Sequence, residues 1–140
     1  MKKEIPPQTI KELSSELVSK VDTAWNERDP DALAALFTED ADLQFYYGHM
    51  VRSRERIKKY YRDKVFPYLS EGLRHVTRSY KVRALTDEVV IGDGRVDLVV
   101  FNEEGEEIAV QRRLKVTTVG VKDEGGWRFS AVRIMVPVKD

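Results

Sequence analysis

The sequence of 140 residues contains no cysteine, no excess charge of either sign and no long hydrophobic run. Without cysteine the chain can form neither a disulfide nor a thiolate zinc site, and it has no cysteine nucleophile. Lysine plus arginine and aspartate plus glutamate both number 24, so no overall field favours a nucleic acid or an anionic membrane as partner. No apolar stretch approaches the roughly 18 residues that a membrane-spanning helix needs. We therefore expect a cytoplasmic protein without a nucleic-acid or membrane partner.

The start of the chain is too polar for a secretory signal. Lys2 and Lys3 resemble the charged beginning of such a signal, but Pro6 and Pro7 follow where an apolar stretch is needed. The length is that of one domain, so we expect a single domain over residues 1–140, with residues 1–8 as a tail. Two histidines on different elements do not make a metal site, and we expect neither a metal nor a cofactor.

Two helices are predicted in the first quarter of the chain. Thr9 and Glu12 have the spacing of a capping box, and apolar residues then recur at three- and four-residue steps to about Glu27. Asp29 is a natural N-cap, and Pro30 fits the first position of a second, short helix.

From Ala41 the hydrophobic period changes to two, which predicts a strand that ends at Gly48. Ser53 can cap a third helix, which Pro67 ends. Alternating residues and turn residues then predict four long strands, over about 73–85, 89–101, 107–122 and 127–138. Helices followed by a run of hairpin-connected strands indicate the α+β class.

Four parts of the chain resemble SnoaL-like proteins of the nuclear transport factor 2-like superfamily. They are the segment Ala24–Asp42, Gly48, the helix Arg54–Tyr61, and Gly126-Trp127-Arg128 at the start of the last strand. The resemblance implies a cone-shaped α+β barrel of cystatin-like topology. In that fold N-terminal helices pack on a strongly curved antiparallel sheet around one pocket.

The turns predict which side chains face that pocket. A two-residue loop at Glu104-Gly105 places Asp97 opposite Arg112. The same loop places Val99 opposite Val110, and similar loops at 86–87 and 124–125 extend the pairing to the neighbouring strands, with Val116 opposite Arg133. A bulge near Gly92–Gly94 would exchange the two faces of the sheet. The predicted inward face is mostly apolar and carries Arg78, Tyr80, Arg95, Asp97, Arg112 and Arg133.

Such a face fits a pocket for a small, partly apolar ligand with a carboxylate or carbonyl group. We expect ligand contacts from Arg78, Tyr80, Arg95, Arg112 and Arg133. A purely structural ion-pair network around Asp97 is the alternative. Tyr47 and His49 lie at a strand end and are candidate proton donors, whereas His75 is predicted on the wetter face.

The resemblance also suggests enzymes against which these residues can be compared. Ketosteroid-isomerase-like members carry an aspartate just before the glycine that corresponds to Gly48, and this chain has none there. Arg95-Val96-Asp97 is similar to the Arg-x-Asp pair of limonene-epoxide-hydrolase-like members, but their second aspartate is missing from the last strand. Scytalone-dehydratase-like lyases use buried histidines, which the predicted inward face lacks. SnoaL-like cyclases use a late acid–base aspartate, and the last strand has none before Asp140.

Two functions are left open. One is a binding domain without turnover. The other is a lyase, isomerase or epoxide-hydrolase-type enzyme with Asp97 as base and Arg95 or Arg112 as electrophilic clamp, assisted by Tyr47, Tyr80 or His49.

The predicted outer face suggests a homodimer. Valine, leucine and isoleucine side chains of the last strand and of a neighbouring strand are predicted to point outward, which would leave a large apolar area exposed. A second copy packed sheet to sheet would cover it. The residues concerned are Val96, Leu98, Val100, Val132, Ile134, Val136 and Val138.

Overall fold

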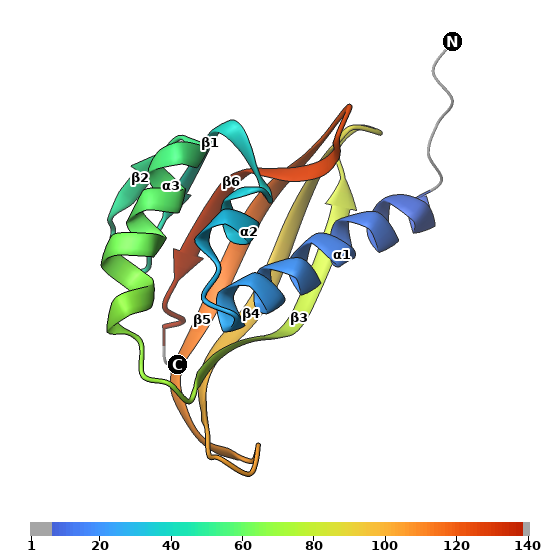
Figure 1. Cartoon of the computed structure of the whole chain (residues 1–140). Helices are drawn as coiled ribbons and strands as arrows, with labels where there is room; N and C mark the ends of the chain where they lie inside the picture. The colour runs from blue at the N-terminus through green and yellow to red at the C-terminus, as the bar shows by residue number, and fades with distance from the viewer. Residues whose placement is uncertain (1–6, 139–140) are drawn as a thin grey trace.

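The computed structural model describes residues 7–138 of the chain. Helices lie on one face of a single sheet, as Figure 1 shows. The helical segments are α1 (Pro7–Asn26), α2 (Pro30–Ala34), α3 (Arg54–Tyr60), the π-helical turn η1 (Tyr61–Val65) and the 3-10 turn η2 (Phe66–Tyr68). The strands are β1 (Phe37–Gln44), β2 (Met50–Arg52), β3 (Leu73–Ala84), β4 (Val89–Phe101), β5 (Glu107–Asp123) and β6 (Gly126–Met135).

The predicted helix starts are confirmed at α2 and α3. The Asp29 carboxylate accepts a hydrogen bond from the Ala32 amide at 3.0 Å, with Pro30 in the first turn. The Ser53 hydroxyl accepts one from the Arg56 amide at 3.2 Å. Helix α1 begins at Pro7, before the predicted cap Thr9, whose side chain lies outside the part that is described.

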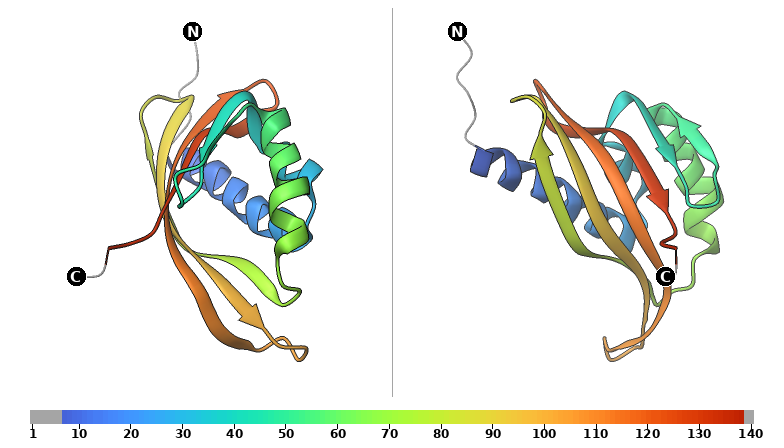
Figure 2. Two further views of the ribbon diagram at one scale, coloured as in Figure 1. Left: turned by 90° about the vertical axis from the view of Figure 1, so that its left-hand side faces the viewer. Right: turned by 180° about the vertical axis from the view of Figure 1, so that it is seen from behind.

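The sheet has six strands in the order β2-β1-β6-β5-β4-β3. The four strands predicted after residue 73 pair antiparallel with one another, as expected. Strand β1 pairs with β6 in parallel, so the sheet is mixed rather than wholly antiparallel. The short β2 was not predicted, and β1 starts at Phe37 instead of Ala41. The sheet curls strongly, and the helices cover its concave side (Figure 2).

Bulges exchange the two faces of the sheet at places that the turns did not reveal. Val99 pairs with Val110, as predicted, but Gln111 is an extra residue in β5, so Asp97 pairs with Arg113 and not with Arg112. A bulge near Gly92–Gly94, which would have exchanged the two faces, does not occur in β4.

Two more bulges act in the same way. Arg78 is the extra residue in β3, between Thr77 and Ser79. In β6 the extra residue is Ser130, so Val116 pairs with Ile134 and not with Arg133 as predicted. The predicted assignment of side chains to the concave face is therefore right for most of β5 and wrong for β4 and β6. One added residue moves every side chain beyond it to the opposite face of the sheet.

The core fills the space between the helices and the concave face. It contains residues of α1, α2, β1, α3 and the sheet, among them Leu17, Trp25, Leu33, Phe37, Leu43, Ile57 and Phe129. Val132 belongs to this core, and Leu98, Val100 and Ile134 pack against it.

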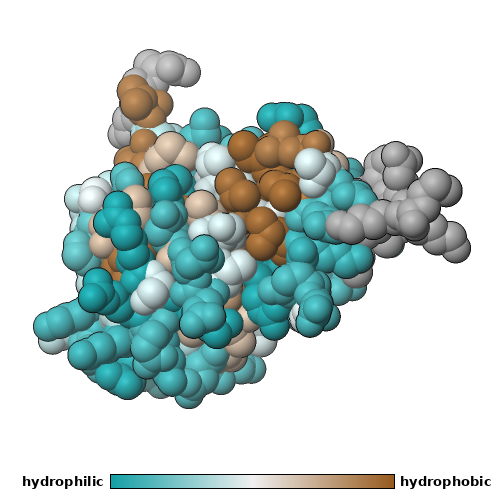
Figure 3. All heavy atoms as spheres, turned by 90° about the horizontal axis from the view of Figure 1, so that it is seen from above, coloured by the Kyte–Doolittle hydropathy of each residue, from teal (hydrophilic) through white to brown (hydrophobic). Residues whose placement is uncertain are grey.

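The outer apolar face predicted for a homodimer is therefore wrong in its residues, because most of them point into the core. The convex face instead places Ile91, Val119 and Ala131 side by side. Figure 3, which views the molecule from above, shows a patch of hydrophobic residues within a largely hydrophilic surface. A homodimer stays a prediction.

No helix in residues 7–138 has the length and apolar character needed to cross a membrane.

The register predicts a large loss of stability for one of two adjacent substitutions in β4 and almost none for the other. Val96→Asp places a carboxylate in the concave interior, where Val96 is 5% exposed, and should cost more than about 3 kcal/mol of unfolding free energy. Arg95→Asp changes an exposed residue and should shift that free energy by about 0.5 kcal/mol or less. Urea denaturation followed by circular dichroism measures both. Equal losses in the two variants would contradict the register.

Candidate functional site

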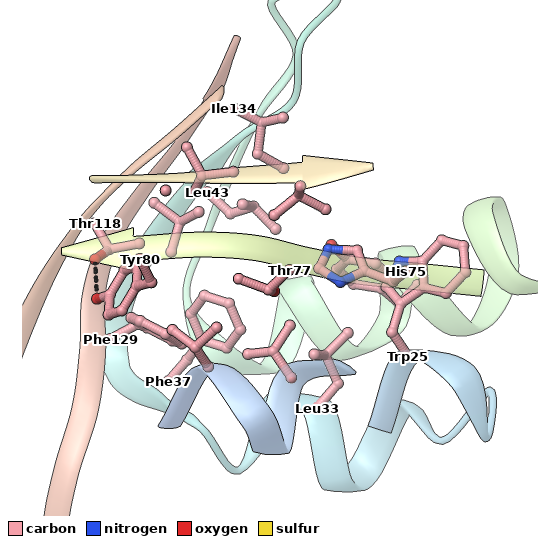
Figure 4. Close-up of a pocket in the computed structure, with 17 residues that line it drawn as sticks. Trp25, Leu33, Phe37, Leu43, His75, Thr77, Tyr80, Thr118, Phe129 and Ile134 are labelled. Atoms are coloured by element: carbon pink, nitrogen blue, oxygen red, sulfur yellow. Dashed lines mark hydrogen bonds between the residues drawn. The ribbon is translucent and has the colours of Figure 1, made fainter. Parts of the chain in front are cut away.

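A cavity of about 70 Å³ lies between α1 and the concave face of the sheet. Its wall is mainly apolar, with polar side chains gathered at its two ends, as Figure 4 shows. Leu33, Phe37, Leu43, Phe129, Val132 and Ile134 supply much of the apolar wall. The arrangement fits a small molecule with an apolar body and polar groups at its ends.

The first polar end contains His75 of β3, paired with Asp22 of α1. His75 Nδ1 lies 2.6 Å from Asp22 Oδ1, and the two side chains are 15% and 27% exposed. The same carboxylate accepts hydrogen bonds from the Thr77 hydroxyl at 2.9 Å and from the Thr77 amide at 3.2 Å. Asp22 is thus held by three donors if Nδ1 carries its proton. Within residues 7–138 the other ring nitrogen, Nε2, has no hydrogen-bond partner.

Two further residues of α1 fix the position of His75. The Asn26 side chain accepts from the His75 amide at 2.7 Å and donates to the His75 carbonyl at 3.1 Å. The Trp25 ring packs against the imidazole with centroids 5.4 Å apart. These contacts tie both the backbone and the ring of His75 to α1.

The second polar end contains Tyr80 and Thr118, whose hydroxyls are 2.7 Å apart. Burial raises the pKa of Tyr80, so its phenol keeps its proton and remains a donor. The ring lies over Gly92, where an added Cβ would come within 2.2 Å of the Tyr80 hydroxyl oxygen. A side chain at position 92 would therefore displace Tyr80.

A second hollow of about 220 Å³ adjoins the cavity and shares Trp25, Tyr61, His75 and Ile134 with it. We call it the vestibule. Its lining also includes Tyr46, Tyr47, Tyr68 and Lys64. His75 therefore stands between the cavity and the vestibule. The guanidinium of Arg112 lies 4.7 Å above the Tyr46 ring, at the border of the vestibule.

The structure places some predicted site residues near this site. Tyr80 lines the cavity and Tyr47 lines the vestibule, where the Tyr47 hydroxyl is 2.7 Å from that of Tyr60. Burial and this hydrogen bond raise the pKa of Tyr47. His49 is exposed and packs on the Tyr60 ring, outside the cavity.

The remaining predicted residues lie elsewhere. Asp97 alternates with Val96 and Leu98, which face the interior, and it pairs with Arg78 at 3.0 Å. Arg78 also binds Glu107 at 2.9 Å. Arg95 is exposed, and Arg133 pairs with Asp42 at 2.6 Å. The prediction that Arg78, Asp97, Arg112 and Arg133 line one cavity with Tyr47 is wrong. Asp97 does contact an arginine, as predicted, and this contact fits the alternative of a purely structural ion-pair network around Asp97.

His75 is the residue that the sequence analysis placed on the wrong face. It was assigned to the wetter side because the bulge at Arg78 was not anticipated. A signal was present in α1, where Asp22 lies four residues after Val18 and three before Trp25, at the edge of the apolar face. An acidic residue on that face requires a buried partner.

Comparisons with known proteins agree with this fold. A family model described as the SnoaL-like domain matches residues 10–133. No curated protein matches the sequence.

Solved structures of the same fold are numerous, and each is distant in sequence. A cystatin-like domain of unknown function from Nostoc punctiforme has a TM-score of 0.80 at 18% identity, covering 94% of this chain and 80% of that one. A putative aromatic ring hydroxylase from Novosphingobium aromaticivorans has a TM-score of 0.80 at 17% identity, covering 96% and 94%. Aln2 from a Streptomyces species has a TM-score of 0.79 at 18% identity, also covering 96% and 94%. At such identities the likeness concerns the fold alone. Since the family model spans most of its length, the chain belongs to the SnoaL-like domain family.

Proposed function

We propose that the chain is an enzyme that binds a small, mostly apolar carbonyl compound in the cavity and transfers a proton on it through His75. The reaction class is that of a lyase or an isomerase. The observation that carries the proposal is that His75, in the wall of an apolar cavity, has its Nδ1 atom 2.6 Å from the carboxylate of Asp22.

The pairing with Asp22 favours one tautomer of the imidazole. A carboxylate accepts hydrogen bonds, so Nδ1 carries the proton and Nε2 has a free lone pair. Nε2 is then a base, and Asp22 stabilises the imidazolium that forms when Nε2 takes up a proton. The donors from Thr77 hold the carboxylate in place during this change.

The cavity can support proton abstraction from carbon. Nε2 removes a proton from the carbon next to a carbonyl group, and the electron pair of the broken C–H bond forms an enolate. In a lyase this pair forms a carbon–carbon double bond as the β-hydroxyl group leaves with the proton from His75, giving water. In an isomerase the proton returns to another carbon. Both steps leave His75 in its starting state.

Tyr80 and Thr118 supply the second contact. Their hydroxyls lie at the other end of the cavity from His75 (Figure 4). A hydroxyl donor there can hold an oxygen of the ligand and fix the reacting carbon near His75. Asp97 has no part in this proposal because it lies outside the cavity.

Binding without turnover is the second candidate. The cavity volume of about 70 Å³ and its apolar wall would equally suit a small ligand that is only held. The two candidates differ in whether a bound carbonyl compound exchanges its α-proton with water.

The first test is deuterium exchange. In D₂O, a panel of small ketones and aldehydes with aromatic or aliphatic bodies is incubated with the protein, and loss of the α-proton signal is followed by NMR. His75→Gln should lower the catalysed exchange rate by about 10²- to 10⁴-fold, because the base is removed. Asp22→Asn should lower it by at least about tenfold, because the tautomer is no longer fixed.

His49→Gln is the matched control, since it makes the same change in a histidine outside the cavity. It should leave the exchange rate unchanged. Thermal melts confirm that each variant is folded. Binding of a panel member without any catalysed exchange would assign the cavity to binding alone.

The second test concerns the far end of the cavity. Tyr80→Phe keeps the ring over Gly92 and removes the hydroxyl, so it should weaken binding of oxygen-bearing ligands by about 2- to 10-fold. Isothermal titration calorimetry measures the change. A hydrocarbon of the same shape should bind both proteins equally, and equal loss for both ligands would rule out a hydrogen bond from Tyr80.

A further inference from the structure

We infer that a groove between β2 and α3 binds a phosphate group carried by the molecule whose apolar body enters the cavity. The inference rests on the proposed function for the cavity and names a part of its substrate. The groove has a volume of about 330 Å³ and lies beside the vestibule. It is lined by His49, Met50, Val51, Arg52, Arg56, Lys59, Tyr60, Asp63 and Lys64.

Positive charge is concentrated around this groove. Residues 52–64 contain seven basic side chains and two acidic ones, a net charge of +5, although the whole chain has a net charge of 0. The rest of the chain therefore carries −5, and the positive field is local to β2, α3 and η1. A local field of this kind attracts an anion to one place on the surface without favouring polyanions over the whole protein.

The cations that line the groove are not engaged elsewhere. Among residues 7–138, Arg52, Arg56, Lys59 and Lys64 have no ion-pair partner. Their neighbour Lys58, which does not line the groove, is paired with Asp31 at 2.8 Å. In the described part of the chain, all four cations that line the groove are thus without an ion-pair partner, whereas the paired Lys58 and Arg62 do not line it.

The acidic residue of the groove is already compensated. Arg62 donates to both oxygens of Asp63, at 2.8 and 3.1 Å, and these hydrogen bonds lower the pKa of Asp63. Arg62 itself does not line the groove. One carboxylate held by one arginine leaves the four other cations uncompensated.

The groove and the vestibule are adjacent, because one side chain lines both and a pair of side chains, one from each, is joined by a hydrogen bond. Lys64 lines both. The Tyr60 hydroxyl on the groove side is 2.7 Å from the Tyr47 hydroxyl on the vestibule side. A molecule that reaches from His75 outward through the vestibule therefore passes Lys64 and arrives at the groove.

The set of donors fits a phosphate or diphosphate better than a single carboxylate. Arginine binds two oxygens of such a group with its planar fork, and lysine adds a point charge. Four cations exceed what one carboxylate can pair with. The rings of His49 and Tyr60, with centroids 4.9 Å apart, also give the groove an aromatic part of its wall.

Inorganic pyrophosphate is the probe for this site. It is titrated into the wild-type protein at low salt, and binding is followed by calorimetry and by the NMR shifts of backbone amides. We expect saturable binding with shifts concentrated in residues 49–64. Arg56→Gln/Lys64→Gln should weaken it at least tenfold. Lys81→Gln/Arg83→Gln removes two charges from exposed residues of β3 and should change it less than twofold.

Three results would overturn the inference. The first is the absence of saturable pyrophosphate binding. The second is an equal loss of pyrophosphate affinity in the two double variants. The third is saturable binding of a single-stranded oligonucleotide in the absence of pyrophosphate binding. The last result would assign the groove to nucleic acid.

His75→Gln separates this inference from the proposed function. It should leave pyrophosphate binding unchanged, because the imidazole lies outside the groove. A carbonyl compound with a phosphorylated side arm should bind the wild type more tightly than the same compound without phosphate, and the Arg56→Gln/Lys64→Gln variant should abolish this difference. If both forms bind the wild type equally, the groove does not serve the ligand of the cavity. If the difference is present but no α-proton exchange occurs, only the catalytic proposal fails.

Discussion

The packing of α1 into the concave face of the sheet is the constraint on which the cavity depends. Trp25 is the centre of this contact. Its ring meets Phe66 edge to face at 6.2 Å, packs on His75 at 5.4 Å and lies under the Arg28 guanidinium at 4.7 Å. Arg28 also donates to the carbonyls of Ser70 and Leu73, which ties the end of α1 to the start of β3. The distance between helix and sheet is therefore fixed, and a space remains between them.

The polar residues around that space illustrate how a mainly apolar core can contain hydrogen-bonded polar groups. A half-buried carboxylate and imidazole cost free energy unless they are hydrogen-bonded, and here Asp22, His75, Thr77 and Asn26 form hydrogen bonds with one another. The contacts come from one helix and one strand that are far apart in the sequence. His75 lies in the mainly apolar wall of the cavity and its side chain is 15% exposed, so a proton transfer there would occur where its pairing with Asp22 is stronger than in open water.

Charge is arranged differently inside and outside. The cavity holds its few polar groups in pairs, whereas the surface beside its entrance collects cations without partners. Arg78, Asp97 and Arg133 of the sheet line neither the cavity nor the groove. Arg78 links Asp97 to Glu107 on β5, and Arg133 links β6 to β1 through Asp42. These pairs connect strands, and their charges are satisfied within the protein.

The sequence by itself determined the order and approximate bounds of the helices and long strands, because caps, periodicity and turn residues are local signals. It also determined the fold family, through the segment Ala24–Asp42. Only the tertiary structure decided which residues meet in the site. Each strand shows alternate side chains to opposite faces, and the bulges at Arg78, Gln111 and Ser130 exchange those faces. A bulge depends on the fit of neighbouring strands on a curled sheet and leaves no mark in the turn sequence. For this reason His75 lies on the concave face, Asp97 lies on the opposite face, buried beside Arg78, and the pairing of His75 with Asp22 became visible only in three dimensions.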